Sequence, residues 1–346
     1  MTRRLLATTA LVAASAILAR QAGAQTALTP GNLLVSRSTY VAPPNLIIPG
    51  VTVLPGGNGT KAATGAVLAD QLANTGVQIV KPGTSATTSA GAYNVTQNGY
   101  PADKPGKDNN FRGETISGNT LFVTKGSGGN GINTIYQVGA AGTLPTGGNA
   151  VAILPGFNTR LASADTTANY DTQYHPFGLF FANATTLYVA DEGIAGQGAN
   201  GTALPAQAGL QEWSLVGGTW VEDYVLQAGL ATGAYAVPGL DAKYNPTTTG
   251  LRNLAGIVNP DGTVSLYAVT ATSSTLTDQG GDPNSVVAIT DVLAAATLPA
   301  GERFSTLAGP VYATVYRGVS ETPAAEPAAL AVLATGVLGL AAGAGA

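Results

Sequence analysis

The chain has 346 residues, of which 45% are hydrophobic and only 10% are charged, with 46 glycines, 20 prolines and no cysteine. Sparse charge with so many turn-forming residues argues against a helical enzyme and favours an all-β protein, while the lack of cysteine excludes disulfides, thiolate metal sites and a cysteine nucleophile. The formal net charge of −4 offers no basic surface, so we expect no nucleic acid among the partners.

The N-terminal residues 1–24 have the pattern of a secretory signal peptide. Arg3 and Arg4 precede an apolar run at 5–19, and Ala-Gly-Ala at 22–24 matches a small-residue cleavage site. We therefore expect export through the inner membrane, to the periplasm, the cell surface or the medium.

Short β-type runs, separated by turns rich in Gly, Asn and Thr, fill the body of the chain at 25–322. Four successive strands joined by tight turns form an antiparallel meander, the blade of a β-propeller. Residues 66–72 suit a short helix by propensity, but their place in the pattern favours a strand, and residues 81–110 are predicted to be a long polar loop. The expected strands are 31–37, 66–72 and 76–80; 112–117, 119–126, 133–139 and 150–156; 178–181, 186–191, 210–215 and 220–226; and 254–259, 263–270, 285–291 and 304–308.

The groups of strands share landmarks, which indicates an internal repeat. Their second strands are similar to one another, at Leu33–Arg37, Leu121–Lys125, Leu187–Asp191 and Leu266–Thr270. The motif that begins a first strand recurs at Tyr316–Ser320 with no blade after it, whereas the N-terminal group lacks a first strand. We therefore predict an all-β, propeller-like ring of about four blades, closed by pairing of the N- and C-terminal strands.

The C-terminal segment 323–346 resembles the PEP-CTERM sorting tail of Gram-negative bacteria. Glu326-Pro327 is followed by nineteen apolar or small residues, just enough to cross a bilayer. Ala325 stands where the family has its first proline, and no terminal arginine cluster is present. The resemblance implies an exosortase-type processing system or a membrane as partner; the alternative is a disordered Ala/Gly tail.

Stretches of the body also resemble uncharacterised secreted bacterial proteins that carry such tails on a propeller-like domain. The stretches are 107–139, 175–193, 209–220 and 250–270. This resemblance implies an exported propeller at the cell surface or in the matrix, with exopolysaccharide as a candidate partner, and no established activity. A looser similarity to gluconolactonase-like propellers implies the alternative of a hydrolase or lactonase-like enzyme.

Arg112, Arg252 and Arg317 hold equivalent places before first strands, and His175 stands near the same place in the remaining blade. First strands line the channel of a propeller, so these side chains could bind a carboxylate, a phosphate or an acidic sugar at the channel mouth. The alternative is that each arginine ties its blade to a neighbour. His175 is the only histidine, and no G-x-S-x-G motif is present to supply the serine of a catalytic triad.

Other charged residues end second strands or lie on a turn. Asp191 and Glu192 stand where Lys125 stands in another blade, so these residues form either a mixed-charge rim for polar ligands or salt bridges between blades. Asp278 and Asp282 lie on a glycine-rich segment and suit Ca²⁺, although the sequence favours the alternative of a plain turn. The sequence thus favours a binding or structural module over an enzyme, with a Ca²⁺-dependent hydrolase as the alternative.

Overall fold

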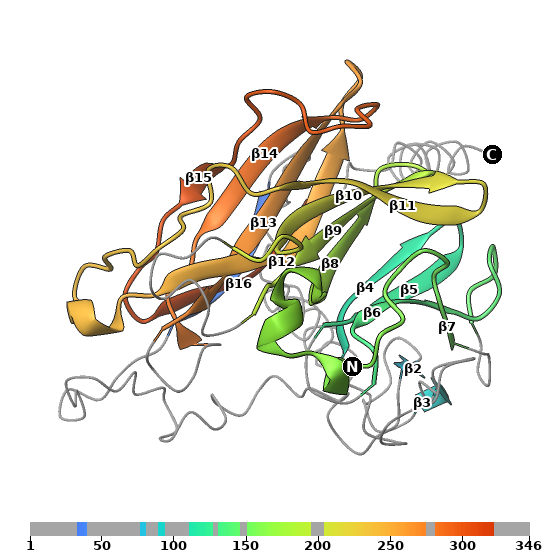
Figure 1. Cartoon of the computed structure of the whole chain (residues 1–346), viewed down its shortest axis with the longest axis horizontal. Coiled ribbons are helices and arrows are strands. Elements are labelled where there is room, and N and C mark those ends of the chain that lie inside the picture. The colour runs from blue at the N-terminus through green and yellow to red at the C-terminus, as the bar shows by residue number, and fades with distance from the viewer. Residues whose placement is uncertain are drawn as a thin grey trace, which may run out of the picture. The chain divides into compact units, whose positions relative to one another are not determined.

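Figure 1 shows the computed structural model of the chain, which describes residues 33–39, 77–80, 89–93, 111–126, 131–145, 151–194, 204–274 and 281–321. The regular structure within these ranges is almost entirely β, with short 3-10 turns η2 (Ala162–Ala164), η3 (Thr167–Thr172) and η4 (Ala242–Tyr244). The predicted signal peptide, the predicted tail and the strand expected at 66–72 lie outside the described residues. None of the described segments forms a helix long and apolar enough to cross a bilayer.

Three sheets have four strands each, and in every one the spatial order follows the chain order. All neighbouring strands are antiparallel, so each predicted meander is confirmed. The strands are β4 (Phe111–Ser117), β5 (Thr120–Lys125), β6 (Thr134–Val138) and β7 (Val151–Ile153); β8 (Pro176–Phe181), β9 (Thr186–Asp191), β10 (Gly209–Val216) and β11 (Thr219–Leu226); and β12 (Thr247–Val258), β13 (Thr263–Ser273), β14 (Val286–Val292) and β15 (Ser305–Ala308).

Two of the hairpins have two-residue turns that require a left-handed backbone. Gly118 and Asn119 join β4 to β5 with φ values of 52° and 55°, and Gly217 and Gly218 join β10 to β11 with 59° and 85°. Positive φ at both positions is the signature of the turn whose twist matches that of paired strands. These turns fix the register of both hairpins.

The first and last described strands pair with each other. β1 (Leu33–Thr39) and β16 (Thr314–Glu321) form a two-stranded sheet, and Ser36 Oγ donates to Gly318 O at 3.5 Å. The predicted pairing of the two chain ends is confirmed. Contacts divide the chain into a larger unit, Val35–Ser320, and a second unit made of the residues before and after it. Every site residue below belongs to the larger unit.

The N-terminal group departs from the prediction. β2 (Val77–Val80) pairs with β3 (Ser89–Tyr93), and this hairpin forms its own two-stranded sheet rather than extending the sheet of β1 and β16. β3 lies inside the segment predicted as a loop. Its Ser-Ala-Gly-Ala-Tyr sequence has weak strand propensity, but pairing with β2 satisfies the backbone polar groups of both segments.

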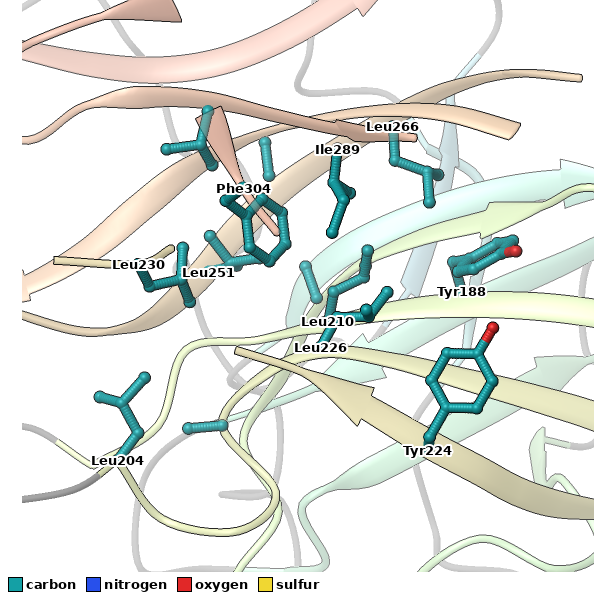
Figure 2. Packing of buried hydrophobic residues seen from close by; sticks show 14 of the residues in the cluster. Tyr188, Leu204, Leu210, Tyr224, Leu226, Leu230, Leu251, Leu266, Ile289 and Phe304 are labelled. Atoms are coloured by element: carbon teal, nitrogen blue, oxygen red, sulfur yellow. The ribbon is translucent and has the colours of Figure 1, made fainter. Parts of the chain in front are cut away.

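The β8–β11 sheet packs against both other four-stranded sheets. Along β9, Leu187 and Val189 belong to the apolar cluster shared with β5 and β6, whereas Tyr188 and Ala190 belong to the cluster shared with β12–β14. Side chains alternate between the faces of a strand, so β9 is buried on both faces. Figure 2 shows the second cluster, in which Leu210 and Leu226 face Leu266 and Ile289 of the neighbouring sheet.

The first strands of these sheets approach one another closely. β8 contacts both β4 and β12. A β-carbon at Gly113 of β4 would overlap the carbonyl oxygen of Phe177, and one at Gly178 of β8 would lie 2.7 Å from the backbone nitrogen of Leu254. Only glycine permits this approach of backbone to backbone. The residue before each glycine, Arg112 or Phe177, is therefore held near the neighbouring first strand.

Candidate functional site

Two arginines and one phenylalanine from three sheets meet where the first strands converge. The guanidinium carbons of Arg112 and Arg252 lie 5.9 Å and 5.6 Å from the centroid of the Phe177 ring. At these distances each guanidinium is attracted to the Phe177 ring by a cation–π interaction, which contributes about 0.5–1 kcal/mol at partly exposed positions. The side chains of Arg112 and Arg252 are 29% and 26% exposed, so both reach solvent.

One carboxylate serves both arginines. Glu192 directly follows β9, and its Oε2 accepts a hydrogen bond from Arg252 Nε at 2.9 Å, while its Oε1 lies 3.8 Å from Arg112 Nε. The Glu192 backbone is itself fixed, because its N–H donates to His175 O at 3.0 Å and its carbonyl accepts from Thr249 Oγ1 at 2.8 Å. Two guanidinium groups therefore face this carboxylate.

The guanidinium of Arg252 retains unused donors. Its Nε makes the only hydrogen bond of this side chain within the described part of the chain, so its two Nη groups have no protein acceptor there. The terminal edge of a guanidinium binds a carboxylate or a phosphate through two parallel hydrogen bonds. The cluster of Arg112, Phe177, Glu192 and Arg252, named the arginine cluster below, can therefore receive an anion.

The structure brings together part of the predicted arginine set. Arg112 and Arg252 converge as expected, and they also link the sheets through Glu192, as the alternative interpretation held. Arg317 lies on β16 with an exposed side chain. Phe177, which sequence reasoning did not single out, occupies the place between them.

His175 has a structural environment. Its backbone N–H donates to Asp191 Oδ2 at 2.6 Å, and its Nδ1 lies 2.9 Å from the carbonyl oxygen of Gly126, which assigns the ring proton to Nδ1 because a carbonyl only accepts. The buried Nε2 has no hydrogen-bond partner among the described residues. No serine–histidine pair is therefore formed within them.

The mixed-charge rim, one of the two interpretations of these strand ends, does not fit the burial of Asp191 and Lys125, which are both 0% exposed. Asp191 accepts from the backbone N–H groups of His175 and Gly193, at 2.6 Å and 2.8 Å. Burial raises the pKa of Asp191 to about 7, opposed by His175 and by these backbone donors. Lys125 Nζ donates to Asn133 at 2.9 Å. Both side chains end second strands between packed sheets, so they stabilise the interior and form no surface for ligands.

Of the two carboxylates predicted to bind Ca²⁺, the structure describes only Asp282. Asp282 is 1% exposed and its Oδ1 accepts from Ser274 Oγ at 2.9 Å, while Asp278 lies outside the described residues. Within the ranges that the structure describes, no group of three or more His, Cys, Asp or Glu could hold a metal ion. The Ca²⁺ site stays a prediction.

Sequence reasoning missed a second polar cluster inside the molecule. Asp291 of β14 is 0% exposed and accepts hydrogen bonds from Tyr188 Oη at 2.7 Å and from Tyr224 Oη at 3.0 Å. A signal was present in the strand expected at 285–291, because Asp291 shares the parity of Val287 and Ile289, and those positions face the core.

Comparison of the chain with protein-family models, with curated proteins and with solved structures finds no match.

Proposed function

We propose that the protein is an exported binding module, and that the arginine cluster takes the acidic group of a small molecule or of an acidic sugar. The observation that carries this proposal is the pair of partly exposed guanidiniums that share one carboxylate. Because Arg252 keeps its Nη edge, an added anion gains both a Coulomb attraction to this guanidinium and two charge-assisted hydrogen bonds from it.

In this proposal the four-stranded sheets are blades of a propeller-like ring with the first strands at its centre. The close approach of β4, β8 and β12 and the pairing of β1 with β16 support it. Imaging that resolves all sheets around one axis tests the ring, and an open row of sheets contradicts it. The proposed export and surface retention rest on the sequence of 1–24 and 323–346, and finding the chain only inside producing cells contradicts them.

The binding proposal is tested by a thermal-shift titration of the purified protein with galacturonate and with inorganic phosphate, and with galactose as the neutral comparison. A ligand at a hundred times its Kd stabilises the native state by about 2.7 kcal/mol, which raises the melting temperature by several degrees. We expect this rise with at least one anion and none with galactose.

The variant Arg252→Gln is expected to abolish the shift, because an amide cannot supply the paired cationic donors. Arg303→Gln is the matched control, since Arg303 is an exposed arginine outside the cluster. A shift that survives Arg252→Gln, or no shift with either anion on a protein that melts cooperatively, overturns the proposal.

A further inference from the structure

Three carboxyl groups and two tyrosines meet in the interior between two sheets. Asp291 lies on β14, Glu302 lies just before β15, and Glu212, Tyr188 and Tyr224 come from β10, β9 and β11. Both tyrosine hydroxyls donate to Asp291, at 2.7 Å and 3.0 Å. Figure 2 shows Tyr224 with its hydroxyl directed toward Tyr188 at one end of the apolar cluster. These five residues are named the acidic cluster below.

Hydrogen bonds between carboxyls require protons. Asp291 is a neighbour of the carboxyl of Glu212 and of that of Glu302, and its charge acts on both. Two ionised carboxylates offer only acceptors, so each of these contacts needs a proton on one partner. Since Asp291 already accepts from both tyrosines, the glutamates are the groups that donate to it.

The unsatisfied oxygens agree with this assignment. Oε2 of Glu212 and Oε2 of Glu302 are buried and receive no hydrogen bond from any described residue, and Glu212 as a whole is only 1% exposed. A buried carboxylate oxygen without a donor is costly, whereas the oxygen of a protonated carboxyl acts as a donor itself. The orphaned oxygens therefore point to a bound proton on each glutamate.

Among the residues that the structure describes, no ion pair neutralises the cluster. The ion pairs of the described residues involve Glu192, Asp165 and Asp241, and none includes Glu212, Asp291 or Glu302. Asp223 of β11 acts on Glu212, and the backbone N–H of Val292 acts on Glu302. The exposed Arg303, next to Glu302 in the chain, lines the same pocket and forms none of these ion pairs. Protons are thus the available means of neutralising it.

The cluster also has a path to solvent. Glu302 is partly exposed and lines a surface pocket of about 490 Å³, together with Ala288, Thr290, Arg303 and Ser305. Glu302 can therefore exchange its proton with bulk water.

We propose that Glu212 and Glu302 each hold a proton and donate it to Asp291, so that the acidic cluster joins the β8–β11 sheet to the β12–β15 sheet as a latch that base releases. Ionisation of the glutamates converts two donors into acceptors and places three negative charges together, with no ion pair among the described residues to neutralise them. The junction then weakens.

The direction of the pH effect follows from the glutamate pKa values. Burial first, and then the neighbouring Asp291, raise the pKa of Glu302 from 4.5 to about 8. Burial and Asp291 also raise the pKa of Glu212 from 4.5 to about 8, and Tyr224 opposes this rise. The folded state then holds protons that the unfolded chain releases, so this stabilisation is complete below about pH 4.5 and is lost as the pH rises through about 8. Burial first, and then the carboxylates, raise the pKa of both tyrosines, which stay protonated throughout.

The test is the melting temperature of the full chain from pH 5 to pH 9.5 for the wild type, Glu212→Gln, Glu302→Gln and the control Glu114→Gln. Glutamine keeps a donor and cannot ionise, while Glu114 is an exposed carboxyl on β4. We expect the wild-type melting temperature to fall by about 5 °C or more across this range, and the fall to shrink by about half in either cluster variant but not in the control. Asp191 also has a raised pKa and lowers the melting temperature in the same direction as the pH rises. The role of the two glutamates is therefore judged from the difference between their variants and the control.

The proposal is overturned if the melting temperature falls with pH equally in Glu302→Gln and Glu114→Gln. Because Glu302 is partly exposed, Glu302→Gln is expected to fold more readily than Glu212→Gln. The infrared absorption of protonated carboxyls in the wild type gives a second readout. We expect it to be present at pH 6.5, to disappear by pH 9.5 and to be weaker in Glu302→Gln. A spectrum with no protonated carboxyl at pH 6.5 contradicts the latch.

Discussion

The arginine cluster and the acidic cluster both join the β8–β11 sheet to its neighbour, and they do so by opposite means. Glu192 is largely buried, but the two arginines that pair with it at 3.8 Å and 2.9 Å are partly exposed. Asp291 is fully buried and accepts from two tyrosine hydroxyls, and in the proposed latch also from two glutamate carboxyls, with no ion pair to it among the described residues.

The difference teaches where each kind of junction can work. Partly exposed ion pairs are weakened by salt and contribute little to stability, but they leave charged donors at the surface for a ligand. A buried carboxylate is protected from salt and depends on its hydrogen bonds, because an unsatisfied group inside the protein retains its full desolvation cost. The arginine cluster therefore suits ligand binding, and the acidic cluster suits holding the two sheets together.

The largest expected effect comes from emptying the centre of the acidic cluster. Asp291→Ala leaves the hydroxyls of Tyr188 and Tyr224 buried without their acceptor, at a cost of about 1–3 kcal/mol each, so we expect a loss of about 4 kcal/mol in the free energy of unfolding. Asp291→Asn keeps an acceptor oxygen and is expected to lose about half as much. Urea unfolding at pH 6 measures both, and equal losses contradict the role of Asp291 as an acceptor.

Sequence reasoning recovered most of the strands because their signals are local. The short apolar runs and the glycine-containing turns of β4–β5 and β10–β11 fix meanders within a few residues. It missed the start of β12, which begins at Thr247 rather than Leu254. Residues 247–249 were expected to belong to a polar loop before the strand. They are nevertheless at most 3% exposed, because they pair with or lie beside β13.

The arginine cluster could be predicted from the sequence in part, whereas the acidic cluster could not. Aligning the repeats placed Arg112 and Arg252 at equivalent positions, and a repeated structure brings equivalent positions together. Tyr188 and Asp291 are 103 residues apart, and no local pattern pairs them. The alternation along β14 marks Asp291 as inward-facing, but its partners depend on how two sheets pack, which no single strand encodes.

A smaller loss is expected from separating the first strands around the arginine cluster. Gly113→Ala places a methyl group against the carbonyl oxygen of Phe177, a backbone atom that cannot move aside without shifting β8. We expect a loss of about 2–3 kcal/mol and weaker anion binding, because Phe177 and Arg112 are displaced relative to each other. Gly309→Ala is the matched control, since a β-carbon there meets no atom within 4 Å. Chemical denaturation that gives the same loss for both variants contradicts the close packing.

The smallest effect on stability, and the sharpest test of the comparison, is expected from Glu192→Gln. Removing the shared charge costs about 1 kcal/mol at low ionic strength, because both arginines are partly exposed, and this cost shrinks as salt screens the ion pairs. The same change is expected to strengthen anion binding at the arginine cluster by roughly fivefold, the equivalent of about 1 kcal/mol, since the ligand no longer competes with an internal carboxylate. Unfolding and titration in 20 mM and 500 mM salt measure the two effects together. A loss of stability that does not depend on salt means that Glu192 acts as a buried carboxylate, as Asp291 does. Lower stability together with tighter anion binding shows instead that the ion pairs of Glu192 stabilise the fold at the expense of ligand affinity.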